Sequence, residues 1–178
     1  MDLHVVRNNI NDIDSRMKLL FDERMNCSKQ VADVKMETSD DIYKPLREKE
    51  ICERFSGEVW YLPFMKKVMQ ISRRFQYQQF IEFDRTDKAF FDSLTEDQMN
   101  ALEHGGIMFL NVRGDETSDA GLGIKDILSI FADTHLQIQE LKVDGIENTV
   151  SVKFLVEDTD KGRLEALGIA YLMFKETI

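Results

Sequence analysis

The fold of the first half is decided at residues 3–35, which read LHVVRNNINDIDSRMKLLFDERMNCSKQVADVK. The side chains that form a seam recur at alternating steps of three and four residues, as in a heptad helix with one buried face. These positions are Leu3, Val6, Ile10, Ile13, Met17, Leu20, Arg24, Cys27, Val31 and Val34. Because no Pro or Gly interrupts residues 1–44, we predict one helix, about 50 Å long for about 35 residues. That exceeds the width of a compact domain, so we expect a second copy of the chain to cover the seam.

Two shorter helices follow this stretch. Pro45 suits a first helical turn, and residues 45–56 read as a second helix with Leu46, Ile51 and Phe55 facing inward. A third helix is predicted from Pro63 to about residue 84. Its apolar stripe consists of Phe64, Val68, Ile71 and Phe75. Helical periods therefore account for the first 84 residues.

The hydrophobic period changes after residue 106. Strands are predicted at 107–112, at 136–143 with a bulge, and at 150–156, and helices at 124–131 and 164–174. Residues 85–106 read as a partly helical linker with a capping box at Thr95 and Gln98. The predicted fold is an all-α three-helix domain (1–84), forming an intertwined dimer through its long helix. After the linker (85–106) comes a small α+β domain of order β-α-β-β-α (107–178).

Composition excludes several classes of protein. The net charge is −10, and the first 84 residues carry 14 Lys and Arg against 15 Asp and Glu, whereas the rest carry 9 against 18. A nucleic-acid binder needs a basic face, so we expect no nucleic-acid partner. The sequence shows neither an apolar membrane span nor a signal peptide. Cys27 and Cys52 form no disulfide framework, which favours the cytoplasm. No metal-ligand spacing occurs, and we expect no metal and no cofactor.

The seam contains an unexpected cation. Arg24 occupies an otherwise apolar position, and Lys35, eleven residues on, returns to within about 20° of it on a helix. An arginine of this kind can simply set the register of a coiled coil by pairing with an acid. The neighbouring helices add further inward-capable polar residues, namely Arg47, Glu48, Ser72 and Gln76. Taken together, they indicate a cavity suited to a small dianion, because Arg pairs bidentately with carboxylates.

Residues 1–84 resemble the all-helical class of chorismate mutases. Residues 3–35 match the first helix of that family, IYKPLREKEICERF (42–55) the second, and VMQISRRFQYQ (68–78) the third. The resemblance implies conversion of chorismate to prephenate, a step toward phenylalanine and tyrosine. That reaction is an intramolecular [3,3] rearrangement, so it requires no nucleophile and no cofactor.

The resemblance also implies a role for each site residue. Lys35 and Gln76 match the two donors to the ether oxygen, and Glu48 matches the acid that holds the ring hydroxyl. The residues that match the substrate-binding positions are Arg7, which reaches into the partner subunit's site, Arg24 and Arg47 at the carboxylates, and Ser72 near the ring carboxylate. Lys44 departs from the family, because relatives often have Asp there.

Residues 107–178 resemble the ACT domain, a regulatory module with a β-α-β-β-α-β core. The similarity lies in IKDILSIFADTHLQIQEL (124–141). It implies an amino-acid effector near Gly121 and Gly123, although these glycines do not align with the Gly-Ala-Leu motif of that module and its fourth strand is missing. A generic α+β domain that only dimerises is the alternative.

Two other functions stay open from the sequence. The mutase half can be an inactive helical dimer that senses a ligand or docks a partner. It can also be a pure coiled-coil scaffold, in which case Arg24 contributes only to register. The preferred prediction is a chorismate mutase regulated through its C-terminal domain.

Overall fold

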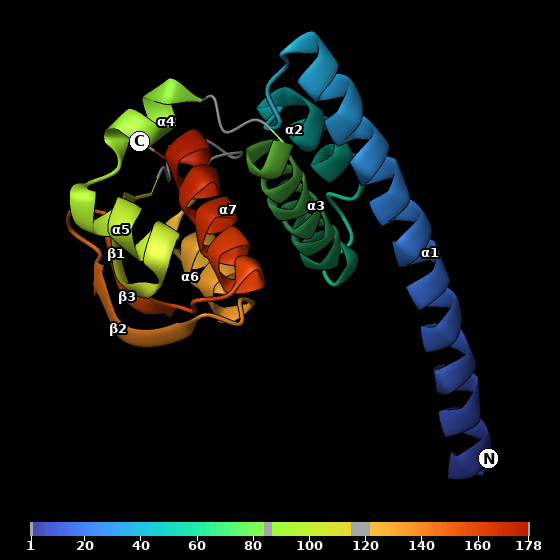
Figure 1. Ribbon diagram of the computed structural model, residues 1–178. Helices are drawn as coiled ribbons and strands as arrows, with labels where there is room; N and C mark the ends of the chain where they lie inside the picture. Colours follow the sequence, from blue (N-terminus) through green and yellow to red (C-terminus); the bar gives the residue numbers. More distant parts are fainter. Residues whose placement is uncertain (1, 84–86, 115–121, 178) are drawn as a thin grey trace. The chain divides into compact units, whose positions relative to one another are not determined.

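The computed structural model describes residues 2–83, 87–114 and 122–177. The chain forms two compact units, Met1–Asp40 and Asp41–Ile178 (Figure 1). No helix in the described ranges is both long and apolar enough to cross a membrane.

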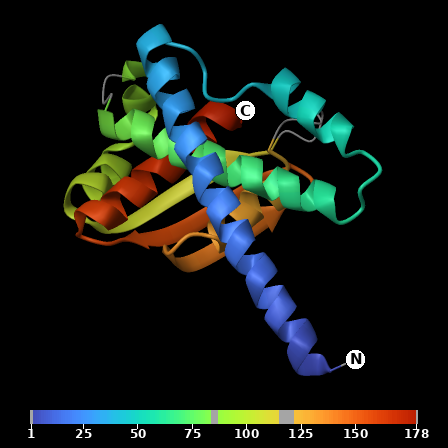
Figure 2. The same cartoon turned by 90° about the vertical axis from the view of Figure 1, so that its right-hand side faces the viewer.

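The first unit consists of one uninterrupted helix, α1 (Leu3–Thr38), visible along its length in Figure 2. The side chain of Asp2 caps its start by accepting a hydrogen bond from His4 N at 2.9 Å, and Ser39, with φ of 52°, ends it in the left-handed region. The prediction of one long helix is confirmed. The seam side chains Ile10, Ile13 and Met17 are exposed, because a lone helix cannot bury its own stripe. Their coverage by a second copy stays a prediction.

The second unit begins with four helices. Their bounds are α2 (Pro45–Arg54), α3 (Tyr61–Phe83), α4 (Lys88–Ser93) and α5 (Glu96–His104). The predicted capping box is confirmed, since Thr95 Oγ1 accepts from Gln98 N at 3.2 Å and Gln98 Oε1 accepts from Thr95 N at 2.8 Å. The inward orientation predicted for Leu46 is wrong, because 79% of this residue is exposed.

A three-stranded antiparallel sheet and two helices complete the unit. The elements are β1 (Gly106–Arg113), α6 (Ile124–Ala132), β2 (Gln137–Asp144), β3 (Thr149–Val156) and α7 (Asp160–Glu176). The order β-α-β-β-α is confirmed, and β3 lies between the other two strands. The predicted bulge is confirmed as a register shift between Ile138 and Glu140. In the hairpin turn, Asp144 Oδ1 accepts from the backbone N–H groups of Ile146 and Glu147 at 2.9 and 3.0 Å.

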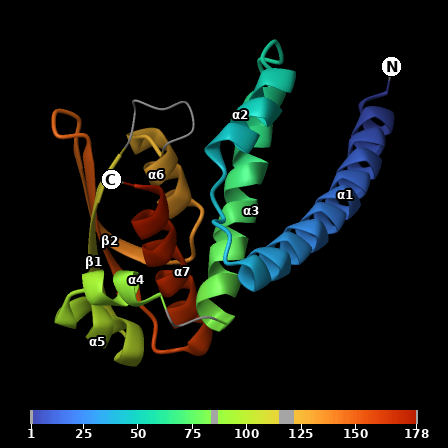
Figure 3. The ribbon, with the colours of Figure 1, turned by 90° about the horizontal axis from the view of Figure 1, so that it is seen from above.

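The second unit is layered, as Figure 3 shows. Helices α6 and α7 cover one face of the sheet, and α3 packs against α7 on the side away from the strands, with α2 beside α3. The core lies mainly between the sheet and α6 and α7, where Met108, Val152 and Phe154 are fully buried. Helix α3 contributes Tyr77 and Ile81 to the same core.

The apolar stripe predicted for the third helix is confirmed only in part. Val68 is buried and Ile71 and Phe75 are half-buried, but Phe64 is exposed, and Tyr77 and Ile81, outside the stripe, are buried in the core. The reason is that α3 packs against α7, a partner almost a hundred residues later in the chain. The contacts between residues divide the chain into two units after Asp40. The domain boundaries predicted from the family resemblance, after residues 84 and 106, stay a prediction.

Candidate functional site

Three of the expected site residues lie on α1, in the first unit. Arg24 and Lys35 share a helix face about 16 Å apart along the axis, and Arg7 lies about 100° around the helix from Arg24. The helix therefore directs two cations to one side and a third to another. These positions are those expected from the sequence.

Arg47 and Glu48 stand in the first turn of α2. Pro45 starts this helix, and a carboxylate in its first turn is favoured by the helix dipole. The guanidinium of Arg47 lies 2.9 Å from Glu50 Oε2, and both side chains are about 60% exposed. An ion pair this exposed adds little stability, so Arg47 can exchange its partner for a ligand carboxylate at small cost.

Ser72 and Gln76 lie one turn apart on α3, and both are buried. Ser72 Oγ donates to Val68 O at 3.0 Å, a bond that Ser commonly makes within a helix. Gln76 Oε1 is buried and has no hydrogen-bond partner within the described residues. A buried amide oxygen without a partner is costly, so the Gln76 amide is a group that a ligand can satisfy.

Arg73 connects Glu48 to the C-terminal helix, and sequence reasoning missed it. Its Nη1 donates to Glu48 Oε2, while its Nε lies 2.9 Å from Glu176 Oε1 and donates to Oε2 at 3.1 Å. The guanidinium carbon also lies 5.1 Å from the ring centroid of Tyr43, a cation–π distance. The available signal was that Arg73 shares a face of α3 with Gln70, three residues before it, and Tyr77, four residues after it.

Burial and charge shift the protonation of this cluster. Burial opposes the charge of Arg73, but Glu176 and Glu48 outweigh it and raise the pKa of the guanidinium. Burial also raises the pKa of Glu176 to about 7, against the attraction of Arg73 and with repulsion from Glu48. The two shifts are compatible, because a single cation cannot fully compensate two carboxylates. The Glu176 side chain is fully buried, with 0% exposure, which is why burial is the largest cause of the shift in its pKa.

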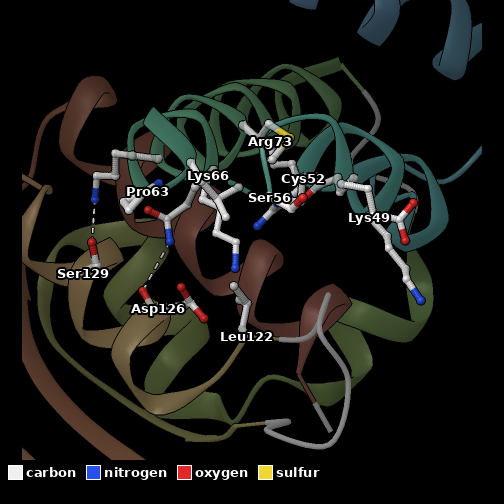
Figure 4. A pocket seen from close by; sticks show the side chains of 15 residues that line it. Lys49, Cys52, Ser56, Pro63, Lys66, Arg73, Leu122, Asp126 and Ser129 are labelled. Carbon is white, nitrogen blue, oxygen red and sulfur yellow. Dashed lines mark hydrogen bonds and ion pairs between the residues drawn. The ribbon is translucent and has the colours of Figure 1, made fainter. Parts of the chain in front are cut away.

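The described residues form a cavity of about 460 Å³ between α2, α3 and α6 (Figure 4). Glu48 and Arg73 border it, and Figure 4 shows Lys66 reaching from α3 toward Leu122. Lys67 Nζ donates to Ser129 Oγ at 2.6 Å across the gap, which fastens α6 to α3. Of the expected site residues that the structure describes, only Glu48 lines this cavity.

Of the two glycines expected near an effector, only Gly123 lies within the described residues. Gly121 lies outside the described residues. Gly123 is the N-cap of α6, and its N–H donates to Asp126 Oδ2 at 3.2 Å. That N–H is therefore already occupied. No group of three or more His, Cys, Asp or Glu in the described part of the chain is arranged to hold a metal.

The comparisons with known proteins assign a family to the helical part. Residues 6–77 match the family model for chorismate mutase type II, and all seven residues expected in the mutase site lie between Arg7 and Gln76. No curated protein and no solved structure matches the chain. The chain therefore carries a chorismate mutase type II family domain at residues 6–77, followed by an α+β region with a three-stranded antiparallel sheet.

Proposed function

We propose that this protein is a homodimeric chorismate mutase that converts chorismate to prephenate in the synthesis of phenylalanine and tyrosine. The observation that carries the proposal is the family match over residues 6–77, which spans every expected mutase residue. A second copy is part of the proposal because Arg7 matches the arginine that enters the partner's site, and because the seam of α1 is apolar and exposed.

Each residue takes the role that the resemblance implies. Arg24 and Arg47 bind the two carboxylates of the substrate together with the partner's arginine that corresponds to Arg7. Ser72 lies near the ring carboxylate. Lys35 and Gln76 donate to the ether oxygen. The unpartnered atom of Gln76 is its amide oxygen, an acceptor, so it can accept from a donor group of a ligand, while the donation to the ether oxygen would come from its NH₂ group.

The chemistry needs binding and electrostatics only. The carbon–oxygen bond of the ether breaks as a carbon–carbon bond forms in the same molecule, so atoms and electrons balance without a co-reactant. Holding the substrate in its folded conformer removes an entropic barrier. Lys35 and Gln76 then stabilise the negative charge that grows on the ether oxygen, as preorganised donors do.

Glu48 is the group that holds the ring hydroxyl. Its Oε2 accepts from Arg73, and a carboxylate has lone pairs left on its other oxygen. With 20% of its side chain exposed, Glu48 can still accept a hydrogen bond from the substrate. The Arg73 contact therefore does not preclude this role.

Residues 107–178 act as a regulatory, ACT-like domain in this proposal. Support comes from the strand order β1-β3-β2 and from the core that α3 shares with α7, which gives the C-terminal region a direct contact with a helix of the mutase domain. The proposed effector is an amino acid.

The test follows chorismate absorbance with purified protein, alone and with phenylalanine, tyrosine or tryptophan. Turnover on the order of 10 s⁻¹, an ordinary enzyme rate, supports the mutase, and a change with one amino acid supports regulation. Light scattering after size exclusion measures the dimer. Absence of turnover by the folded dimer contradicts the proposal.

An inactive, ligand-sensing helical dimer is the second candidate function. The observation that favours it is the pairing of Glu48 with Arg73, which occupies one oxygen of an expected substrate contact. Lys44, at the N-cap of α2, also departs from the family pattern. Binding of chorismate by calorimetry without its conversion would support this candidate.

A further inference from the structure

We propose that Arg73, anchored by Glu176 of α7, is a positioning residue that fixes the Glu48 carboxylate for the substrate hydroxyl. The inference rests on the proposed mutase function and deepens it. It assigns a role to a residue of the C-terminal helix in a site formed by the N-terminal helices.

The geometry of the guanidinium supports this role. The group is planar and rigid, so fixing one edge fixes the direction of the other. Glu176 holds the Nε side, and Nη1 bonds Glu48 Oε2. The ring of Tyr43 lies over the same guanidinium and restricts its tilt.

Exposure increases along the row of contacts, from the buried anchor Glu176 through Arg73 to Glu48. The exposed fraction of the side chain is 0% for Glu176, 9% for Arg73 and 20% for Glu48. The anchor is therefore sealed from water, while the last member of the chain of contacts can meet a ligand. If the Glu48 carboxylate is displaced, its hydrogen bond to the substrate hydroxyl becomes weaker.

Docking of α7 onto α3 does not by itself require these charges. A buried ion pair commonly contributes no more stability than apolar side chains of similar volume. Tyr77 and Ile81 of α3 already pack in the core that includes α7. The ion pair adds a fixed direction for the Arg73 guanidinium, which apolar packing cannot supply.

A merely structural pair and a positioning pair predict different kinetics. If the pair only docks α7, its loss lowers the folded fraction, so kcat per total protein falls and KM is unchanged. If it orients Glu48, a contact to the substrate hydroxyl in both ground and transition states is weakened, so KM rises and kcat changes little.

The experiment is run at pH 8, above the pKa of about 7 of Glu176, so that this carboxylate is ionised. It compares Glu176→Gln, which removes the charge and keeps the shape, with Lys175→Met as a matched control. Lys175 is the preceding residue on α7 and pairs with Asp87 at 2.7 Å, away from Glu48. We expect Glu176→Gln to raise KM for chorismate about tenfold, the size of a weakened hydrogen bond to a charged group, with kcat within about twofold. The control leaves both constants unchanged. In a Glu48→Gln background, Glu176→Gln adds no further increase in KM.

Equal KM values for wild type, Glu176→Gln and Lys175→Met, with normal wild-type turnover, overturn this inference and leave the mutase intact. Absence of wild-type turnover overturns the mutase proposal instead. In that case a double-mutant cycle on the unfolding equilibrium still decides whether Glu176 and Glu48 are linked. A link predicts that the double variant departs at least about fivefold from the product of the single effects, and additive effects overturn it.

Discussion

The carboxylate of Asp87 accepts a hydrogen bond from the Tyr171 hydroxyl at 2.9 Å, which ties the start of α4 to α7. Asp87 also caps α4, because Oδ1 accepts from Phe90 N at 3.1 Å, and Lys175 Nζ lies 2.7 Å from Oδ2. Burial works to raise the pKa of Asp87, but the hydrogen bonds from Lys175, Phe90 N and Tyr171 outweigh it and lower that pKa. One carboxylate thus joins three separate groups.

We expect Asp87→Ala to lower the free energy of unfolding by about 2 kcal/mol, because a cap and a partly buried hydrogen bond are lost together. Urea denaturation at pH 7 measures the change, and Asp92→Ala, an exposed site on the same helix, is the control. Because the pKa is lower in the folded state, this contribution is present above the ordinary value of 3.8 and is lost as the pH falls below it. Equal stability of the two variants would contradict this prediction.

A second prediction concerns the close approach of α3 and α7 at Gly168. A Cβ at this position would lie 2.5 Å from Gln78 Cγ, so Gly168→Ala forces the helices or the Gln78 side chain to move. We expect a loss of about 1–3 kcal/mol in the free energy of unfolding, although Ala is the better helix former.

Gln78→Ala removes the atom that clashes, and thus provides the control. In that background Gly168→Ala should stabilise the protein by up to about 1 kcal/mol, the difference in helix propensity. Thermal or urea unfolding of the four variants measures the sign reversal. If Gly168→Ala has the same effect in both backgrounds, the close approach to Gln78 is not what constrains residue 168.

Local patterns predicted the elements of this chain better than their packing. The heptad spacing of residues 3–34 predicted α1, and Thr95 with Gln98 predicted the start of α5, because both signals act within a few residues. The buried side of α3 was predictable only in part: Val68 of the predicted stripe is buried, but the burial of Tyr77 and Ile81 depends on contact with α7. Phe64 is therefore exposed in spite of its place in the predicted stripe.

The candidate site was predictable to the same extent. Helix spacing predicted that Ser72 and Gln76 lie on one side of α3, whereas the roles of Gln76 and Glu48 come from the family resemblance and stay a prediction. Arg73 escaped notice because its two acidic partners lie 25 residues before it and 103 residues after it. Contacts across such sequence separations leave no periodic signal in a single sequence.

Lys35 provides the direct test of the proposed chemistry. We expect Lys35→Ala to lower kcat about 10²–10³-fold, the usual effect of losing one preorganised donor to developing charge. Lys29→Ala, at an exposed position on another face of α1, is the control and should retain wild-type turnover. Chorismate turnover within about threefold of wild type for Lys35→Ala would remove this residue from the site.

Arg24 separates the enzyme from a coiled-coil scaffold. As a seam residue that only sets register, it would cost stability, and Arg24→Leu would raise the thermal midpoint of the dimer without other effects. As a carboxylate ligand, its loss should weaken chorismate binding at least about tenfold, as expected for a charged hydrogen bond. Scanning calorimetry and the KM for chorismate, measured on the same preparation, distinguish the two.

The protonation of Glu176 makes stability depend on pH near neutrality. Burial raises its pKa from 4.5 to about 7, with Arg73 and Tyr77 of α3 and Glu48 of α2 as the groups that face it. A carboxyl with a raised folded-state pKa binds its proton more tightly when folded. The bound proton therefore contributes fully to the free energy of unfolding below about pH 4.5, and this contribution is lost as the pH rises through about 7.

Glu176→Gln lacks this titration. The free energy of unfolding of the wild type should therefore fall relative to that of the variant between pH 5 and pH 8, the range that brackets the shift. Urea denaturation of both proteins across this range measures the difference, and parallel curves would show that Glu176 ionises at the same pH in the folded and unfolded chain.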